Sequence, residues 1–74
     1  MAFARVKYPA ILQNKSKKQI EEVLDNIYNE RLRNIAKDYY LNEECKIDIA
    51  FKYNVERRTI EAYLKKAINE IEHL

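Results

Sequence analysis

The chain has 74 residues, of which 47% are hydrophobic and 35% are charged, and it contains no glycine, one proline and one cysteine. This length predicts one domain, and the composition is globular rather than disordered. An internal disulfide is excluded because Cys45 is the single cysteine, and no apolar run reaches the roughly 18 residues that a membrane span needs. We therefore expect a cytoplasmic protein without a membrane partner.

The net charge of +2 is distributed in blocks along the chain. Residues 1–18 hold five basic and no acidic residues, residues 19–44 hold three basic and seven acidic, and residues 45–66 hold six basic and three acidic. Such blocks indicate charge placed on particular surfaces. For the N-terminal block, simple solvation of a small domain is an equal alternative.

Residues 1–15 are expected to form an N-terminal arm. Pro9 prevents a helix through Tyr8 and favours extended backbone there. Because apolar residues alternate with basic ones, we expect the arm to pack as a strap over part of the core, and an arm that contacts DNA is the alternative. The apolar residues are Phe3, Val6, Tyr8, Ile11 and Leu12.

Residues 16–40 have the pattern of an amphipathic helix. Ser16 and Gln19 fit a capping box at its start. We expect one long helix over residues 17–40, with a break at Asp25 or Asn29 as the alternative, because either residue could cap a new helix. The apolar positions recur at steps of three and four and are expected to be core. They are Ile20, Val23, Leu24, Ile27, Tyr28, Leu32, Ile35, Ala36 and Tyr39.

Residues 45–65 have the pattern of a helix-turn-helix. A short helix is expected up to Tyr53, and the small Ala50 would allow a close crossing with the next helix. Asn54 tolerates the positive φ that a sharp turn requires. A second helix is expected to begin near Arg57, at the position where such motifs enter the DNA major groove.

The last helix extends about two turns beyond this motif, which gives a domain over residues 16–74. We expect the extra turns either to pack on the long first helix or to meet a second subunit, with Ile68, Ile71 and Leu74 as the candidate contact surface. The whole inner face of this helix is Ile60, Tyr63, Leu64, Ala67, Ile68, Ile71 and Leu74.

Signatures of catalysis are missing from the sequence. A chain without glycine has no phosphate-cradling loop of the dinucleotide-binding or P-loop type. One cysteine and one histidine, Cys45 and His73, do not make a zinc ligand set. Nothing in the sequence brings Ser16 to His73 as a nucleophile and base. We therefore expect no enzyme, no catalytic residue, no metal and no cofactor.

Several short runs within residues 30–74 form a known signature: Tyr39-Tyr40-Leu41, Ile49-Ala50, Tyr53-Asn54-Val55, Arg58-Thr59-Ile60, Leu64-Lys65-Lys66-Ala67 and Ile71. Through them the chain resembles region 4 of the sigma-70 family, the domain that reads promoter −35 elements. Two features depart from the family pattern. Asn54 replaces the usual glycine, and Cys45 and Glu56 stand where hydroxyl caps are common. The resemblance implies an all-α helix-turn-helix domain that binds double-stranded DNA and can dock on RNA polymerase.

Helical geometry then assigns candidate site residues. If Ile60 and Leu64 face inward, the opposite face of the same helix is free to meet DNA. Arginine pairs with guanine, glutamate accepts from cytosine, and an alanine methyl touches the thymine methyl. Glu61 could instead pair with Arg57 or Lys65 at spacing four, and each lysine could be merely solvated. The candidate base contacts are Arg57, Arg58, Glu61 and Ala62, and the candidate phosphate contacts are Lys46, Lys52, Thr59, Lys65 and Lys66.

The expected function is that of a sequence-specific transcriptional regulator, similar to the small stand-alone proteins of phages and mobile elements. A homodimer is expected because one recognition helix covers only a few base pairs. Two alternatives remain. One is a DNA-packaging protein that resembles a small terminase subunit. The other is a protein-binding adaptor or inhibitor that acts on RNA polymerase or another host factor.

Overall fold

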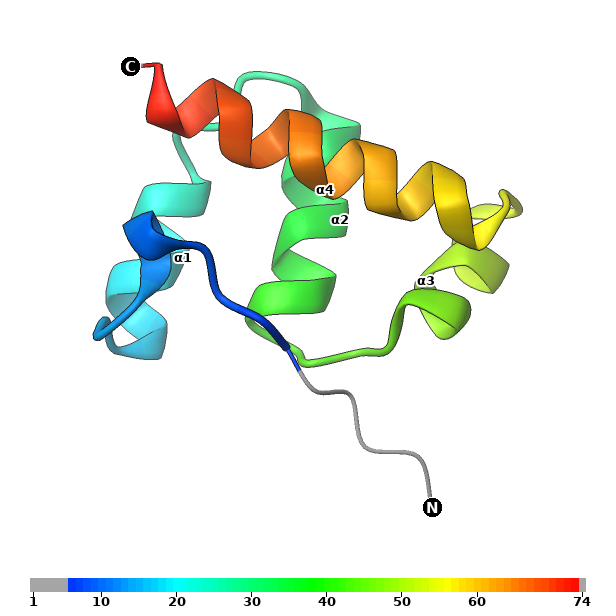
Figure 1. Cartoon of the computed structure of the whole chain (residues 1–74), viewed down its shortest axis with the longest axis horizontal. Coiled ribbons are helices and arrows are strands. Elements are labelled where there is room, and N and C mark those ends of the chain that lie inside the picture. Colours follow the sequence, from blue (N-terminus) through cyan, green and yellow to red (C-terminus); the bar gives the residue numbers. More distant parts are fainter. Residues whose placement is uncertain (1–5, 74) are drawn as a thin grey trace.

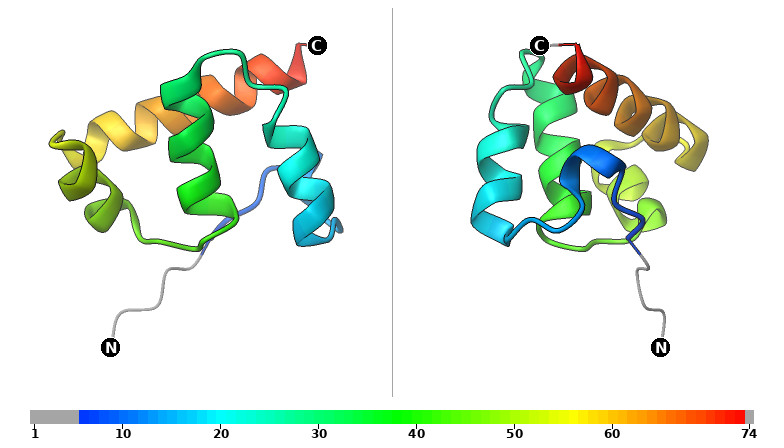
Figure 2. Two further views of the ribbon diagram at one scale, coloured as in Figure 1. Left: turned by 180° about the vertical axis from the view of Figure 1, so that it is seen from behind. Right: turned by 60° about the vertical axis from the view of Figure 1, so that its left-hand side comes forward.

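Helices account for 68% of the residues that the computed structural model describes, which are residues 6–73, and no strand occurs among them (Figures 1 and 2). The expected all-α class is therefore confirmed. In chain order the elements are the short 3-10 helix η1 (Ala10–Leu12), α1 (Lys17–Leu24), α2 (Glu30–Tyr40), α3 (Lys46–Tyr53) and α4 (Arg57–Glu72).

The expectation of one long helix over residues 17–40 is wrong, because the chain leaves the helix after α1 and begins a new one at α2. The capping box at the start of α1 is confirmed: the Ser16 hydroxyl accepts from the Gln19 N–H at 3.2 Å, and the Gln19 side chain accepts from the Ser16 N–H at 2.9 Å. A second cap begins α2, where the Asn29 side chain accepts from the Leu32 N–H at 3.1 Å. The break at Asn29 was the alternative that the sequence had offered.

The two apolar residues between α1 and α2, Ile27 and Tyr28, face in opposite directions. Ile27 is buried, and its carbonyl accepts from the guanidinium of Arg33 at 3.2 Å. Tyr28 is 93% exposed, so its expected place in the core is wrong. The Tyr28 N–H instead donates to the carboxylate of Glu70 at 3.0 Å, which joins the connection to the last turns of α4.

The turn between α3 and α4 is a Schellman motif. Asn54 has φ 57° and ψ 46°, in the left-handed region, as expected for the residue that reverses the chain. Its N–H donates to the Phe51 carbonyl at 3.2 Å, and the Val55 N–H donates to the Ala50 carbonyl at 2.9 Å. Cys45 and Glu56 precede α3 and α4 without a side-chain cap bond. Backbone geometry therefore makes this turn without help from hydroxyl caps.

Two further residues of the described chain have positive φ, and neither is glycine. Asn14 has φ 60° in the connection before α1, and Glu43 has φ 56° in the connection between α2 and α3. The Glu44 N–H, next in the chain, donates to the Asp38 carbonyl at 3.1 Å and closes the end of α2. These residues make tight reversals that glycine would make without a side-chain penalty.

One core is shared by all four α-helices, and α4 packs on both α2 and α3 (Figure 1). Ile60, Leu64, Ala67 and Ile71 form the buried face of α4. Ile71 is therefore core within the chain and is unavailable as a contact to a second subunit, which corrects that part of the expected surface. Ile68 is half-buried, and Leu74 lies outside the described residues.

The described part of the N-terminal arm packs across the domain. We call this segment, residues 6–13, the strap. Leu12 is buried, and Val6, Tyr8 and Ile11 pack against the core. The Tyr8 hydroxyl donates to the Tyr40 carbonyl at 3.3 Å at the end of α2. Figure 2 shows the strap running beside α1 and the lower end of α2. Phe3 lies outside the described residues.

Candidate nucleic-acid interface

The two arginines at the start of α4 project into solvent. The side chain of Arg58 is 87% exposed and that of Arg57 is 62% exposed. Arg57 lies 3.8 Å from the Glu61 carboxylate, and Arg58 lies 3.7 Å from the Glu56 carboxylate. Exposed ion pairs of this kind contribute about 0–1 kcal/mol, so either guanidinium can exchange its carboxylate for another acceptor. The start of α4 thus presents two accessible groups capable of paired hydrogen bonds.

Glu61 forms two ion pairs, and the one with Arg57 is the spacing-four contact that the sequence offered as an alternative to a base contact. Its carboxylate lies 3.5 Å from the ammonium group of Lys46 and 3.8 Å from the guanidinium of Arg57. Lys46 is the first residue of α3, so this contact joins the starts of the two helices. Lys46 also lies 5.6 Å from the ring centre of Tyr39. Glu61 therefore lies between two cations on this side of α4.

A cleft of about 910 Å³ lies along α4 and collects several of the candidate residues. Exposed residues of α4 form one wall of the cleft, and Lys46, at the start of α3, also lines it. The floor includes the aromatic residues Tyr39 and Tyr40 at the end of α2. Five of the nine candidates line this cleft: Lys46, Glu61, Ala62, Lys65 and Lys66.

The phenol of Tyr40 remains neutral at the floor of the cleft. Burial raises the pKa of Tyr40 to about 12, and the adjacent Tyr39 contributes in the same direction. The two rings meet edge to face with their centres 5.0 Å apart. The Tyr40 phenol therefore keeps its proton further into the alkaline range than an exposed tyrosine does.

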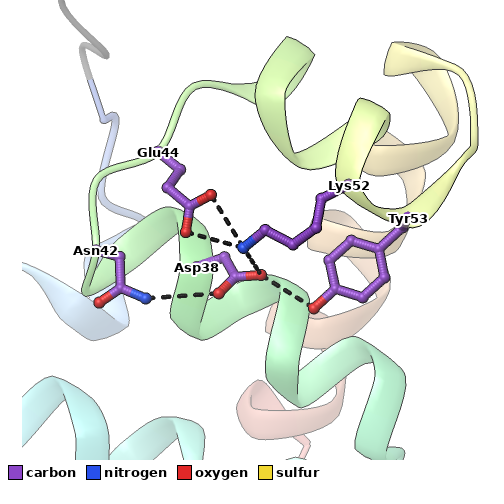
Figure 3. Close-up of polar contacts among 5 residues, drawn as sticks. All are labelled: Asp38, Asn42, Glu44, Lys52 and Tyr53. Carbon is purple, nitrogen blue, oxygen red and sulfur yellow. Dashed lines mark hydrogen bonds and ion pairs between the residues drawn. The ribbon is translucent and has the colours of Figure 1, made fainter.

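Lys52 lies in a different environment from the other candidate lysines (Figure 3). Its ammonium group lies 3.2 Å from the carboxylate of Asp38 and 3.0 Å from that of Glu44, and the Tyr53 hydroxyl donates to Asp38 at 3.0 Å. The hydrogen bond to Glu44 is the largest cause that raises the pKa of Lys52, and burial raises the pKa of Tyr53. Lys52 thus fastens α3 to α2 and the connection between them, and it does not line the cleft.

Thr59 is also outside the cleft. It is half-buried in the first turn of α4, where its N–H donates to the Glu56 carbonyl at 3.0 Å. Arg57 and Arg58 stand beyond the end of the cleft lining, at the exposed start of the helix. Seven of the nine candidate residues therefore form two parts, an arginine pair at the start of α4 and a lysine-lined cleft along its side, and Lys52 and Thr59 belong to neither.

Sequence reasoning missed two features, one in the cleft and one on the exposed side of α3. Lys7 of the strap lines the cleft beside the lysines of α4, and its signal was the basic block of residues 1–18. Ile47 and Phe51 are 63% and 89% exposed on α3. Their spacing of four was visible in the sequence, since the same helical period that turned Ile49 inward turns these two outward.

Metal-binding and membrane-spanning features are not found in the part of the chain that the structure describes. Within residues 6–73, no three His, Cys, Asp or Glu side chains gather in a way that could hold a metal ion. No helix of that part has the length and apolar character to cross a membrane. Comparison with known protein families, with curated proteins and with solved structures finds no match to the chain.

Proposed function

We propose that the protein is a sequence-specific DNA-binding regulator that reads the major groove through α4. The observation that carries the proposal is the pair of accessible arginines at the start of α4, directly beside a cleft lined by lysines. An α-helix fits the major groove, arginine reads guanine there, and lysine holds the flanking phosphates. Arg58 is the leading base contact because it is the more exposed of the two.

The resemblance to region 4 of the sigma-70 family supports the same assignment. Its signature runs from the end of α2 through α3, the Asn54 turn and α4. The helices α3 and α4 pack on each other, and both Ala50 and Ile60 are buried. We extend the proposal to a regulator of the kind carried by phages and mobile elements, acting as a homodimer on a two-fold site. Such a dimer would use a surface other than Ile71, because that residue is buried.

The test begins with selection of bound duplexes from a random DNA pool. Affinities for the selected site and for random duplex are then measured at two salt concentrations for the parent, Arg57→Ala, Arg58→Ala and Lys66→Ala. Loss of a base-reading pair should cost about 1–3 kcal/mol on the selected site and relax the preference at one position. Loss of Lys66 should weaken both duplexes alike and lower the salt slope by about one unit.

The outcome that contradicts the proposal is specific. If both arginine variants keep the parent's ratio of selected-site to random-duplex affinity, α4 does not read sequence. Lys18→Ala is the matched control, because Lys18 is an exposed lysine on α1 that does not line the cleft. It should leave the ratio unchanged.

A second candidate function is a protein-binding adaptor or inhibitor that acts on RNA polymerase or another host factor. It is favoured by the exposed Ile47 and Phe51, which stand one turn apart on the outer face of α3. Large exposed apolar side chains that adjoin each other are typical of contact surfaces. Phe51→Ser separates the two candidates without changing the net charge. It should leave DNA affinity intact if the protein is a DNA reader, and it should abolish polymerase binding if the protein is an adaptor.

A further inference from the structure

Lysines from three separate segments converge on the cleft along α4. Lys7 comes from the strap, Lys46 from the start of α3, and Lys65 and Lys66 from the middle of α4. The cleft spans about 910 Å³, and its floor is made of tyrosine rings and aliphatic side chains. Lysine stems can lie along such a floor while the ammonium groups stay at the rim. The fold, and not the local sequence, therefore creates this cluster of charge.

Positive charge exceeds negative charge around this cleft. Its carboxylates are Glu61 and Glu72, and Glu61 is already held by Lys46 and Arg57. Within residues 6–73, Lys7, Lys65 and Lys66 form no ion pair at 4 Å or less. Like charges gathered in one concavity repel each other, and a polyanion relieves that repulsion while it releases its own counterions.

The strap holds Lys7 in place through its neighbours in the chain. Val6 and Tyr8 both pack against the core, whereas Lys7 between them is exposed. Three contacts fix Tyr8: its hydroxyl donates to the Tyr40 carbonyl at 3.3 Å, its ring centre lies 5.9 Å from that of Tyr40, and its carbonyl accepts from Gln13 at 3.1 Å. Lys7 is thus presented to the cleft by a packed segment.

We infer that Lys7 binds a backbone phosphate of the same duplex that α4 contacts, so that the strap and α4 hold one DNA strand between them. The inference rests on the proposed function for the identity of the polyanion, which is duplex DNA. The strap is therefore both a cover for the core and a part of the binding surface. This joins the two roles that the sequence had offered for the arm as alternatives.

The test compares Lys7→Gln with Lys18→Gln in the full chain. Both variants remove one exposed lysine of the basic N-terminal block, and only Lys7 lines the cleft. Binding to the selected duplex is measured over a series of salt concentrations. Lys7→Gln should lower the slope of log affinity against log salt by about 0.9, and Lys18→Gln should leave it unchanged. The ratio of selected-site to random-duplex affinity should stay at the parent value, because phosphate contacts carry no sequence information.

Lys7→Arg keeps the charge and should restore the parent slope, and equal thermal midpoints for all variants exclude misfolding as the cause. Three results overturn the inference: an unchanged slope for Lys7→Gln, equal slope losses for Lys7→Gln and Lys18→Gln, or no duplex binding by the parent. The first two leave the proposed reading by Arg57 and Arg58 standing. A slope loss confined to Lys7→Gln, together with arginine variants of unchanged specificity, would instead support the phosphate contact and contradict sequence reading.

Discussion

Asn54 holds a side chain in a backbone conformation that glycine adopts freely, and this one residue reverses the chain between α3 and α4. Asn54→Ala should lower the free energy of unfolding by about 1 kcal/mol, because alanine tolerates positive φ poorly. Asn54→Gly should stay close to the parent. Urea unfolding midpoints measure both changes. Asn34→Ala, the same substitution at an exposed position inside α2, should be neutral or slightly stabilising.

Lys52 shows how a residue's role can depend on distant segments. Its partners Asp38 and Glu44 lie on α2 and in the following connection. Lys52→Gln should cost up to about 1 kcal/mol of stability, in keeping with a half-exposed ion pair. It should also leave the salt slope of DNA binding unchanged, whereas Lys66→Ala lowers it. If Lys52→Gln lowered the salt slope of DNA binding, Lys52 would be a phosphate contact after all.

Spacing along the sequence could predict the exposure of Arg57 and Arg58, because it follows from the inward period of Ile60 and Leu64. It could not predict that Lys52 is held by carboxylates or that Lys7 lines the same cleft as the lysines of α4. Both facts depend on which helices pack together, and no local pattern contains that information. The ion pair between Glu61 and Lys46 likewise depends on the packing of α3 against α4.

The break between α1 and α2 shows that a local pattern also fails to predict where a helix ends. Apolar steps of three and four continue through Ile27 and Tyr28, so the helical period does not reveal an interruption. A cap at Asn29 stabilises a new helix by only about 1 kcal/mol, which is similar to what local continuation of the helix offers. Contacts between distant elements favour the break, including the bond between Tyr28 and Glu70. In contrast, α3 ends at Tyr53 and α4 begins at Arg57, as predicted, because the left-handed backbone of Asn54 ends one helix and turns the chain toward the next.

The crossing of α3 and α4 depends on a small residue at Ala50, which is buried. Ala50→Leu should overpack this contact and cost about 1–3 kcal/mol, as measured by chemical unfolding. Ala62→Leu adds the same atoms at an exposed position of α4 and should change stability by less than about 0.5 kcal/mol. An Ala50→Leu variant with full stability and reduced DNA binding would mean that Ala50 faces DNA.

At the scale of the whole molecule, three groups make the fold sensitive to alkali. The pKa values of Tyr40, Tyr53 and Lys52 are all raised in the folded chain from ordinary values of 10.0, 10.0 and 10.5, and that of Tyr40 reaches about 12. The folded state thus holds these protons more tightly than the unfolded chain does. Their contribution to stability is complete below the unfolded values and is lost as the pH rises through the folded values.

We therefore expect stability to decline above about pH 10, with Tyr40 as the largest single cause. Tyr40→Phe keeps the ring in the core and removes the ionisable group, so helical circular dichroism should persist to higher pH in this variant. Tyr28→Phe is the matched control, because Tyr28 is exposed and should not affect the transition. Identical alkaline transitions for Tyr40→Phe and the parent would show that another group governs the unfolding.

The positive φ values of Asn14, Glu43 and Asn54 have a consequence for how this sequence can evolve. Glu43 carries the largest penalty, of about 1–2 kcal/mol, because neither its backbone nor its side chain favours the left-handed region as asparagine does. A single codon change to glycine would recover much of that energy without altering a contact in the core. Since most substitutions destabilise a small domain, such a change would act as a general suppressor. The stability gained by Glu43→Gly would therefore offset the cost of new side chains on the exposed face of α4, so that the domain stays folded while that face changes.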